Sequence, residues 1–324
     1  MMESQAKRLA LEQLYKDNFK PEVYLSTYYR TLDVEVEFFL GNLHHFFFVS
    51  NGGQHGEGDG TCRTRQVEPE VNDADDGGEK AVHNNETKKK EGRRVLEIGS
   101  GPVPISMISA SRWSEWIVCS DFLEQNRQNI KQWLTMTAIT STAPGRHDET
   151  WLPFFRYVTE LERAESETLL LDRVRLSVRA VVPCNVLLTD PLMNDKDAAQ
   201  NADGCSSLYD VIITTLCLEF ATLSVDEYSS AVGNVTSLLR PEGFLVIQGA
   251  LGNSHYWHNN HQFPSVTLSR AVVESAIKNA GCLVVDWREL ARCCSPQDKP
   301  ADHSAVFYCL ARKNPIQTTT TTTK

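Results

Sequence analysis

The chain has 324 residues, enough for one large domain or two small ones. Its formal net charge is −10 and no basic stripe is visible, which argues against nucleic acid as a partner. The first residues contain no apolar signal-peptide core, and the apolar stretch 36–49 is too short and too polar to span a bilayer. Together with nine cysteines that lack CxxC spacing, this predicts a reduced, cytoplasmic protein.

Residues 1–49 are expected to form a helical cap. Apolar residues within 9–15 and within 39–47 recur at helical spacing. Three tyrosines, Tyr24, Tyr28 and Tyr29, lie between these segments. Because aromatic clusters are usually packing, the residues alone favour a role in the core, with the lid of a binding site as the alternative.

Two segments have the composition of disordered chain. Residues 50–92 are dominated by Gly, Asp, Glu, Asn and Lys, and their few apolar residues show no period. Such a segment cannot bury enough surface to offset the entropy lost on ordering. We therefore expect a disordered low-complexity insertion at 50–92, a disordered threonine-rich tail at 314–324, and a folded core at 93–313.

The stretch 94–121 has the pattern of a nucleotide-binding unit. A short apolar strand runs into Gly99, Ser100 and Gly101, a helix is expected over 104–111, and a second strand ends at Asp121. Two glycines let the backbone turn tightly and let a ligand approach without a Cβ in the way. An acid about 20 residues after the glycines is where nucleotide-binding α/β folds hold ribose hydroxyls.

Two features of this loop bear on which nucleotide it takes. A dinucleotide fingerprint needs a third glycine, and Pro104 stands at that position. Glu97 precedes the loop and would repel a diphosphate, whereas cationic S-adenosylmethionine tolerates it better. An NAD(P)-dependent oxidoreductase is the alternative, and a non-catalytic S-adenosylmethionine-binding protein is a third hypothesis.

Strands and helices alternate through the rest of the core. Strands are expected at 181–187, 210–216, 244–250, 283–287 and 305–310, with a polar loop at 251–266 and mixed helix and loop over 151–178. Ser224 and Ser269 begin two of the helices. This alternation predicts a mostly parallel sheet with helices on both faces. Ligands bind such sheets at the carboxyl ends of the strands, which makes Thr215 and Glu219 site candidates, and Asn126 lies close enough to Asp121 to face the same ligand.

Several longer stretches carry a resemblance to a known family. FKPEVYLSTYY, LEIGSGP, SDFLEQNRQNIKQWL, TTLCLEF, LLRPEGFLVIQGALGNSHYW and AVFYCLARK occur in the family's order. The chain resembles the small-molecule N-methyltransferases that act on phenylethanolamine, nicotinamide and indolethylamine, and SDFLEQNRQ and GALGNSHYW look closest to the phenylethanolamine branch. The resemblance implies a class I, Rossmann-like methyltransferase with a seven-stranded α/β sheet, an N-terminal helical cap and S-adenosylmethionine as cofactor.

The resemblance also implies roles for individual residues. Tyr24 and Tyr29 would close over the cofactor, which shifts the interpretation of the tyrosines from core to lid. The remaining cofactor contacts that it implies are Gly99, Ser100, Gly101, Asp121, Asn126, Asn185, Val186 and Thr215.

The chain departs from the family's pattern at four positions. Ile105 stands where the family usually has tyrosine, and Asn185 where it has aspartate. Gly249 replaces an acid of the nicotinamide branch, and Asn253 replaces a second acid of the phenylethanolamine branch. The departure at Gly249 puts nicotinamide in doubt as the acceptor, and the departure at Asn253 puts phenylethanolamine in doubt.

The expected chemistry is in-line methyl transfer to a nitrogen. An alkylamine is mostly protonated at pH 7 and must lose a proton before it attacks, so a carboxylate near the methyl group is needed. Glu219 matches the acid of the phenylethanolamine branch and is the predicted catalytic residue. By the same resemblance, Tyr256, Ser265 and Asp302 are predicted to contact the substrate.

The remaining predictions concern metals and partners. His255, His258 and His261 are spaced by three on an expected loop with no acid or cysteine partner nearby, so no metal site is expected. The predicted partner is a small-molecule amine, with neither nucleic acid nor membrane, and the protein is expected to be a monomer.

Overall fold

The computed structural model describes residues 2–50, 92–135, 147–193, 208–292 and 300–316. The insertion predicted to be disordered lies outside the described residues except at its two ends, as does the predicted tail from residue 317 onward.

The helical cap predicted at the N-terminus is confirmed. It consists of α1 (Met2–Asn18), α2 (Pro21–Tyr28) and α3 (Val34–His44), which continues into the π-helical turn η1 (His45–Ser50). Proline at the first position of α2 suits a helix start, because its missing N–H would have no partner there. Asp33 caps α3, since its side chain accepts the backbone N–H groups of Glu35 and Val36.

The described core is a seven-stranded, mostly parallel sheet with helices between the strands. The strand order is β3-β2-β1-β4-β5-β9-β8, in which the first five strands are parallel and β9 is antiparallel to both neighbours. This confirms the predicted fold class. The elements after the cap are β1 (Arg94–Ile98), α5 (Met107–Trp113), β2 (Trp116–Asp121), α6 (Glu124–Thr135), α7 (His147–Glu162), α8 (Glu167–Ser177), β3 (Val178–Pro183), β4 (Tyr209–Thr215), α10 (Leu218–Ala221), α11 (Val225–Ser237), β5 (Leu239–Leu251), β6 (His255–His258), β7 (His261–Pro264), α12 (Arg270–Asn279), β8 (Cys282–Ala291) and β9 (Ala305–Lys313).

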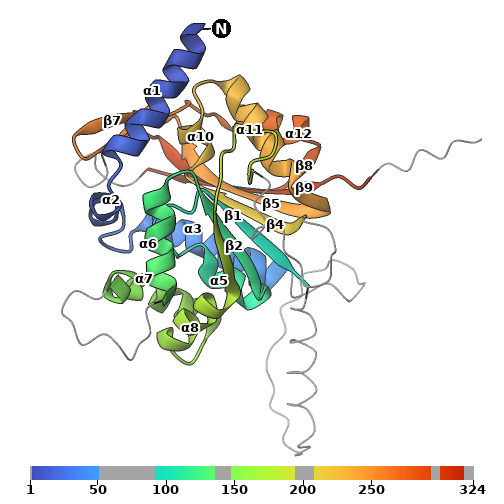
Figure 1. Ribbon diagram of the computed structural model, residues 1–324. Helices are drawn as coiled ribbons and strands as arrows, with labels where there is room; N and C mark the ends of the chain where they lie inside the picture. The colour runs from blue at the N-terminus through green and yellow to red at the C-terminus, as the bar shows by residue number, and fades with distance from the viewer. Residues whose placement is uncertain (1, 51–91, 136–146, 194–207, 293–299, 317–324) are drawn as a thin grey trace, which may run out of the picture.

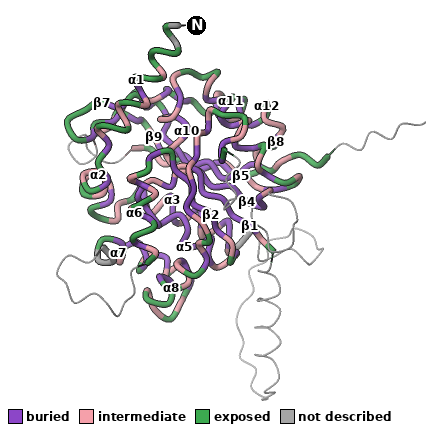
Figure 2. Tube along the Cα trace, in the orientation of Figure 1, coloured by how far each residue is buried: buried purple, intermediate pink, exposed green. Residues whose placement is uncertain are grey.

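Alternate residues of each central strand pack on opposite faces of the sheet. On β1, Val95 belongs to the core shared with α3, α5, α7 and α8, whereas Leu96 and Ile98 belong to the core shared with α11 and α12. Figure 1 shows the helices divided between the two faces, and Figure 2 shows the buried strands between them. Helices cover both faces of the sheet, so β1 and β4 are buried on both sides, which explains their continuous apolar runs.

Two expectations about the strands were wrong. Residues 251–266 are not all loop, because β6 and β7 form a hairpin that turns at Asn259 and Asn260, both at positive φ. The third strand begins at Val178 and ends at Pro183, since the side chain of Asn185 accepts the N–H of Leu187 and turns the chain.

The first core helix begins at Met107 rather than at residue 104, because the turn after the glycines takes up the residues between. The segment expected to mix helix and loop contains α7 and α8, and Ser166 caps the second of these by accepting the N–H of Leu169.

The sheet has its topological switch point between β1 and β4. From β1 the chain continues to β2 and β3 on one side, whereas β4 and β5 lie on the other. Loops at the carboxyl ends of strands diverge at such a point and leave a crevice for a ligand. The loops after β1 and β4 meet there, since a Cβ on Gly99 would lie 2.2 Å from Sγ of Cys217.

Candidate active site

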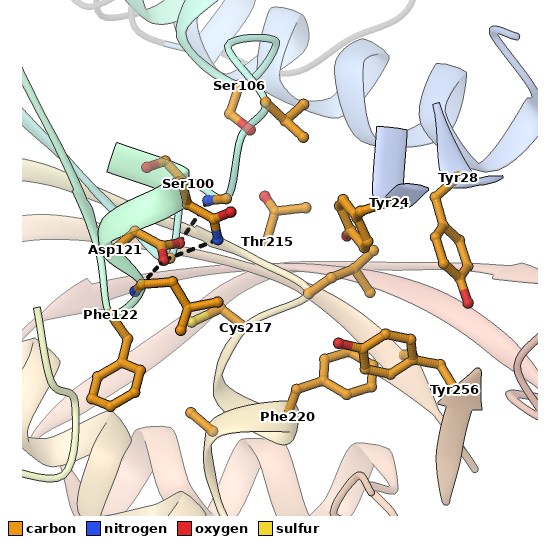
Figure 3. Close-up of a pocket in the computed structure, with 18 of the residues that line it drawn as sticks. Tyr24, Tyr28, Ser100, Ser106, Asp121, Phe122, Thr215, Cys217, Phe220 and Tyr256 are labelled. Atoms are coloured by element: carbon orange, nitrogen blue, oxygen red, sulfur yellow. Dashed lines mark hydrogen bonds between the residues drawn. The ribbon is translucent and has the colours of Figure 1, made fainter. Parts of the chain in front are cut away.

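A cavity lies at the carboxyl ends of the strands, over the switch point and beneath the cap. Its wall combines the cap helices with the loops that follow β1, β2, β4 and β5 and with the start of β9. Figure 3 shows Asp121 and Phe122 on one side of it and Tyr28 and Tyr256 on the other. The described residues that line it include Arg8, Glu12, Tyr24, Tyr28, Tyr29, Glu35, Glu97, Gly99, Ser100, Gly101, Ile105, Ser106, Asp121, Phe122, Asn126, Asn185, Val186, Thr215, Leu216, Cys217, Phe220, Ala250, Asn253, Tyr256, Ala301 and His303.

The glycine loop adopts a conformation that other residues would resist. Gly99 and Gly101 have φ values of +69° and +58°, in the left-handed region. At Gly99 a side chain is also excluded by Cys217. The residue that follows β4 is under similar constraint, because Leu216 has a φ of +48° and its N–H bonds to the carbonyl oxygen of Gln248. Such strained backbone is often found at ligand sites.

Asp121 is held at the end of β2 by three hydrogen bonds. Its Oδ2 accepts the N–H of Gly101 at 2.8 Å, and its Oδ1 accepts the N–H of Leu123 at 2.8 Å and Nδ2 of Asn126 at 3.1 Å (Figure 3). Burial raises the pKa of this carboxyl, and the same hydrogen bonds counteract that rise. The acid that the sequence singled out therefore also fixes the glycine loop.

Glu97, the last but one residue of β1, lines the cavity. It is buried, and its Oε2 has no hydrogen-bond partner among the described residues. Burial raises its pKa to about 8, although a hydrogen bond with Ser106 lowers it. An orphaned buried carboxyl is costly unless a ligand completes it. The side chain therefore suits a cationic ligand, which would stabilise its ionised form.

The two tyrosines of α2 and the tyrosine that follows it fit both roles considered for them, core packing and the lid of a binding site. Tyr24, Tyr28 and Tyr29 all line the cavity. Tyr24 also packs on Phe19 at a ring-centroid distance of 5.0 Å, and Tyr29 packs on Phe154 at 6.1 Å. Burial raises the pKa of Tyr24 to about 12. They are thus parts of the cap's packing whose outer faces form the roof of the cavity.

Most of the other predicted contacts are brought together. Asn126, Asn185, Val186, Thr215 and Tyr256 all line the cavity, although they come from separate parts of the chain. Ile105, where the family has tyrosine, lines it as well.

Glu219 is placed behind the cavity wall. Its side chain is 1% exposed, and its Oε1 accepts the N–H of Ala250 at 3.0 Å. Burial raises its pKa to about 7, and its backbone hydrogen bonds lower it. It is not among the described residues that line the cavity, so its catalytic role stays a prediction.

Two predicted substrate contacts are not brought into the cavity. Asp302 faces the hairpin, where its oxygens accept from Ser254 and the N–H of His255. Within the part of the chain that the structure describes, Ser265 bonds to the backbone of Ser254 and to the carbonyl oxygen of Val266. Neither lines the cavity, and Ala301 and His303, on either side of Asp302, take that place.

Some cavity residues gave no signal in the sequence. Glu35 and His303 are 268 residues apart, and their side chains are 2.9 Å from each other. Asn253 was noted only as a departure from the family, yet it is fully buried in the cavity wall. The one usable signal was the capping aspartate before α3, which places Glu35 in the first turn of that helix.

Comparison with known proteins places this site in a family. A sequence profile of the NNMT/PNMT/TEMT family matches residues 79–314, which is well over half of the chain. The chain belongs to the NNMT/PNMT/TEMT family. Human nicotinamide N-methyltransferase is 33% identical over 229 residues, covering 68% of this chain and 77% of the relative.

Other relatives come from the remaining two branches. Mouse indolethylamine N-methyltransferase is 29% identical over 308 residues, covering 93% of this chain and 95% of its own, and human phenylethanolamine N-methyltransferase is 29% identical over 228 residues, covering 70% and 76%. These identities do not single out the phenylethanolamine branch, so that preference stays a prediction.

The family match agrees with the geometry of the cavity. The protein is an S-adenosylmethionine-dependent N-methyltransferase, which leaves no support for the oxidoreductase alternative. Asp121, Asn126, the glycine loop and the orphaned carboxyl of Glu97 are the residues that fit the cofactor. When bound, S-adenosylmethionine supplies an electrophilic methyl group on a sulfonium.

None of the described helices has the length and apolar composition to cross a bilayer. No group of three or more His, Cys, Asp or Glu side chains in the described part of the chain is arranged to hold a metal ion. His258, one of the three spaced histidines, instead accepts the N–H of Lys20 at 2.9 Å and ties the hairpin to the cap.

Proposed function

We propose that the protein methylates the nitrogen of a small arylalkylamine. The observation that carries this proposal is the charge of the cavity wall. Its lining holds the acids Glu12, Glu35 and Asp121, and also Glu97, whose raised pKa keeps it largely protonated at pH 7 until a cation binds, against His303 and one arginine. That arginine already pairs with Glu227 and donates to a backbone carbonyl, so the wall favours a cationic acceptor.

Aromatic rings supply the complementary apolar surface. Phe220 and Tyr256 meet edge to face at 5.0 Å, and Tyr28 meets Tyr256 in the same way at 6.0 Å. These rings lie on the side of the cavity away from Asp121 (Figure 3). An aryl group can pack on such rings while its ammonium faces the acids.

The position of Gly249 argues against a nicotinamide-like acceptor. The acid that the nicotinamide branch carries there cannot be accommodated, because a Cβ on Gly249 would lie 2.7 Å from the ring of Phe307 and 2.9 Å from Oε1 of Glu219. Ala250 follows on the same strand and lines the cavity.

The protein's own residues have three tasks in this reaction. The glycine loop and Asp121 fix the cofactor, the aromatic rings orient the acceptor, and the cap excludes water from the reacting nitrogen. Glu219 was predicted to accept the ammonium proton, and this stays a proposal because its carboxyl is turned toward the N–H of Ala250.

Methyl transfer can be screened directly. Purified protein with S-adenosylmethionine is offered phenylethylamines, indolethylamines and pyridines, and methylated products are measured by mass spectrometry. We expect the arylalkylamines to have the highest kcat/KM. A preference for pyridines would refute the acceptor class, and cofactor binding without turnover of any acceptor would favour the non-catalytic hypothesis.

We further propose that the protein works as a monomer in the cytoplasm. The cysteines at 119, 184, 217, 282 and 309 are free thiols in the described chain, which suits a reducing compartment. The net charge of −10 disfavours nucleic acid as a partner. Light scattering on the purified protein and subcellular fractionation test these two points.

A further inference from the structure

Glu35 and His303 form a buried ion-pairing contact in the cavity wall. Nε2 of His303 lies 2.9 Å from Oε1 of Glu35, and the two residues are 7% and 3% exposed. The backbone of Glu35 is held in place, because Asp33 caps the helix and accepts the backbone N–H of Glu35 at 3.0 Å. The carboxylate accepts the Nε2 proton, which leaves Nδ1 as the acceptor nitrogen of the neutral ring.

Nδ1 of His303 is available for a ligand. It has no hydrogen-bond partner among the residues that the structure describes. Two other charged groups near it have partners of their own. Arg292, after β8, donates to the carbonyl oxygens of Ala301 and His303, and Asp302 faces the hairpin. Tyr28 of α2 contributes its ring to the same wall.

Asn253 lies beside this pair and also lacks partners. The antiparallel ladder ends at the pair of Leu251 and Ala305, and an isolated bridge pairs Tyr256 with Ala301. Asn253 and His303 lie on the two segments between these pairs, and both line the cavity. The side chain of Asn253 is fully buried, and neither its Oδ1 nor its Nδ2 has a partner in the described chain. Unsatisfied buried polar groups are costly and mark a place that a ligand completes.

We propose that His303, oriented by Glu35, accepts the proton of the acceptor's ammonium group. The inference rests on the proposed function and names the base for it. The N–H bond of the ammonium breaks, its electron pair stays on nitrogen, and the proton binds Nδ1. The imidazolium that results is held by the carboxylate of Glu35, a positioning residue. The free lone pair can then take the methyl group, and the ring returns its proton to solvent after the product leaves.

Two isosteric variants separate this role from a structural one. His303→Gln can still reach Glu35, because its terminal amide replaces Nε2, but it has no basic nitrogen. Glu35→Gln keeps the shape and removes the charge that stabilises the imidazolium. We expect His303→Gln to lower kcat/KM for a phenylethylamine about a hundredfold at pH 7 and Glu35→Gln about tenfold.

The pH profile and the acceptor type show whether the lost function is proton transfer. The loss should shrink as the pH approaches the pKa of the amine, and a pyridine acceptor, which has a free lone pair, should change by less than about threefold. His255→Gln is the matched control, since this histidine lies on the neighbouring hairpin and does not line the cavity. It should match wild type with both acceptors.

Glu219→Gln completes the comparison. Equal losses for amine and pyridine in His303→Gln, or none for either, would overturn the inference. A selective, pH-dependent loss in Glu219→Gln with His303→Gln unaffected would assign the proton to Glu219 and overturn it as well. Melting temperatures of all four variants identify any that fail to fold, in which case Glu35→Gln decides.

Binding measurements keep this inference separable from the proposed function. Methyl transfer by wild type to an arylalkylamine upholds the proposed function whatever the variants do. If wild type transfers to no acceptor, calorimetry of phenylethylamine binding to the protein with S-adenosylhomocysteine decides the inference. An affinity about tenfold weaker in His303→Gln upholds it, and unchanged affinity or no binding by wild type overturns it.

Discussion

The hydrogen bonds of Asp121 allow a quantitative prediction of how much cofactor affinity is lost when its side chain is removed. A carboxylate offers about four acceptor positions. Three are filled, by the N–H groups of Gly101 and Leu123 and by Nδ2 of Asn126. One position on Oδ2 therefore remains for a ribose hydroxyl.

A hydrogen bond to a charged group contributes about 1.5–3 kcal/mol. Asp121→Ala should therefore weaken S-adenosylmethionine binding by at least about tenfold, and up to about 150-fold. Asp121→Asn keeps the volume but turns a donor toward the N–H of Gly101, so it should also disturb the glycine loop and lower the melting temperature.

Isothermal titration calorimetry with S-adenosylmethionine measures this loss. Glu124→Gln is the matched control, because it removes one negative charge from the exposed first turn of the next helix, outside the cavity. It should bind like wild type, which separates a contact from general attraction of a cation. Unchanged affinity in Asp121→Ala, or an equal loss in Glu124→Gln, would refute the site as described.

Four further outcomes are expected. Gly99→Ala should lower the melting temperature and abolish cofactor binding, because its Cβ would lie 2.2 Å from Sγ of Cys217. Gly101→Ala has free space for its Cβ, so it should lose only roughly 1–2 kcal/mol of stability through left-handed strain. Equal losses in the two variants would contradict this. Because the pKa of Glu97 is raised to about 8, S-adenosylmethionine binding at pH 7 should release up to one proton, measured by calorimetry in buffers of different ionisation enthalpy, and Glu97→Gln should release fewer. The same raised pKa means that the folded chain holds a proton which the unfolded chain has lost, so the unfolding free energy without cofactor should fall as the pH rises from about 5 through 8, and Glu97→Gln should flatten that slope. Gly249→Asp should unfold at lower temperature without gaining pyridine turnover, because its Cβ would meet Phe307 at 2.7 Å; a stable variant active on pyridines would refute the steric argument.

The sequence alone determined the fold class and the cofactor side of the cavity. Buried parallel strands leave continuous apolar runs, and the glycine loop and Asp121 lie within one strand-helix-strand unit, so their spacing along the chain is also their arrangement in space. The seven strands of the main sheet were therefore predicted, and so was the glycine loop that lines the cavity. The hairpin of β6 and β7 was missed because its strands have only four residues each, carry three histidines between them and show no apolar alternation.

Only the tertiary structure decided the acceptor side. Glu35 and His303 meet because α3 packs over the end of β9, a contact between residues 268 positions apart that no local pattern encodes. Whether a side chain near a strand end faces the cavity depends on the register of the ladder, and a shift of one residue reverses it. That is why Asp302 turns to the hairpin while His303 lines the cavity, and why Glu219, placed by the sequence at the right strand end, directs its carboxyl to the backbone of Ala250.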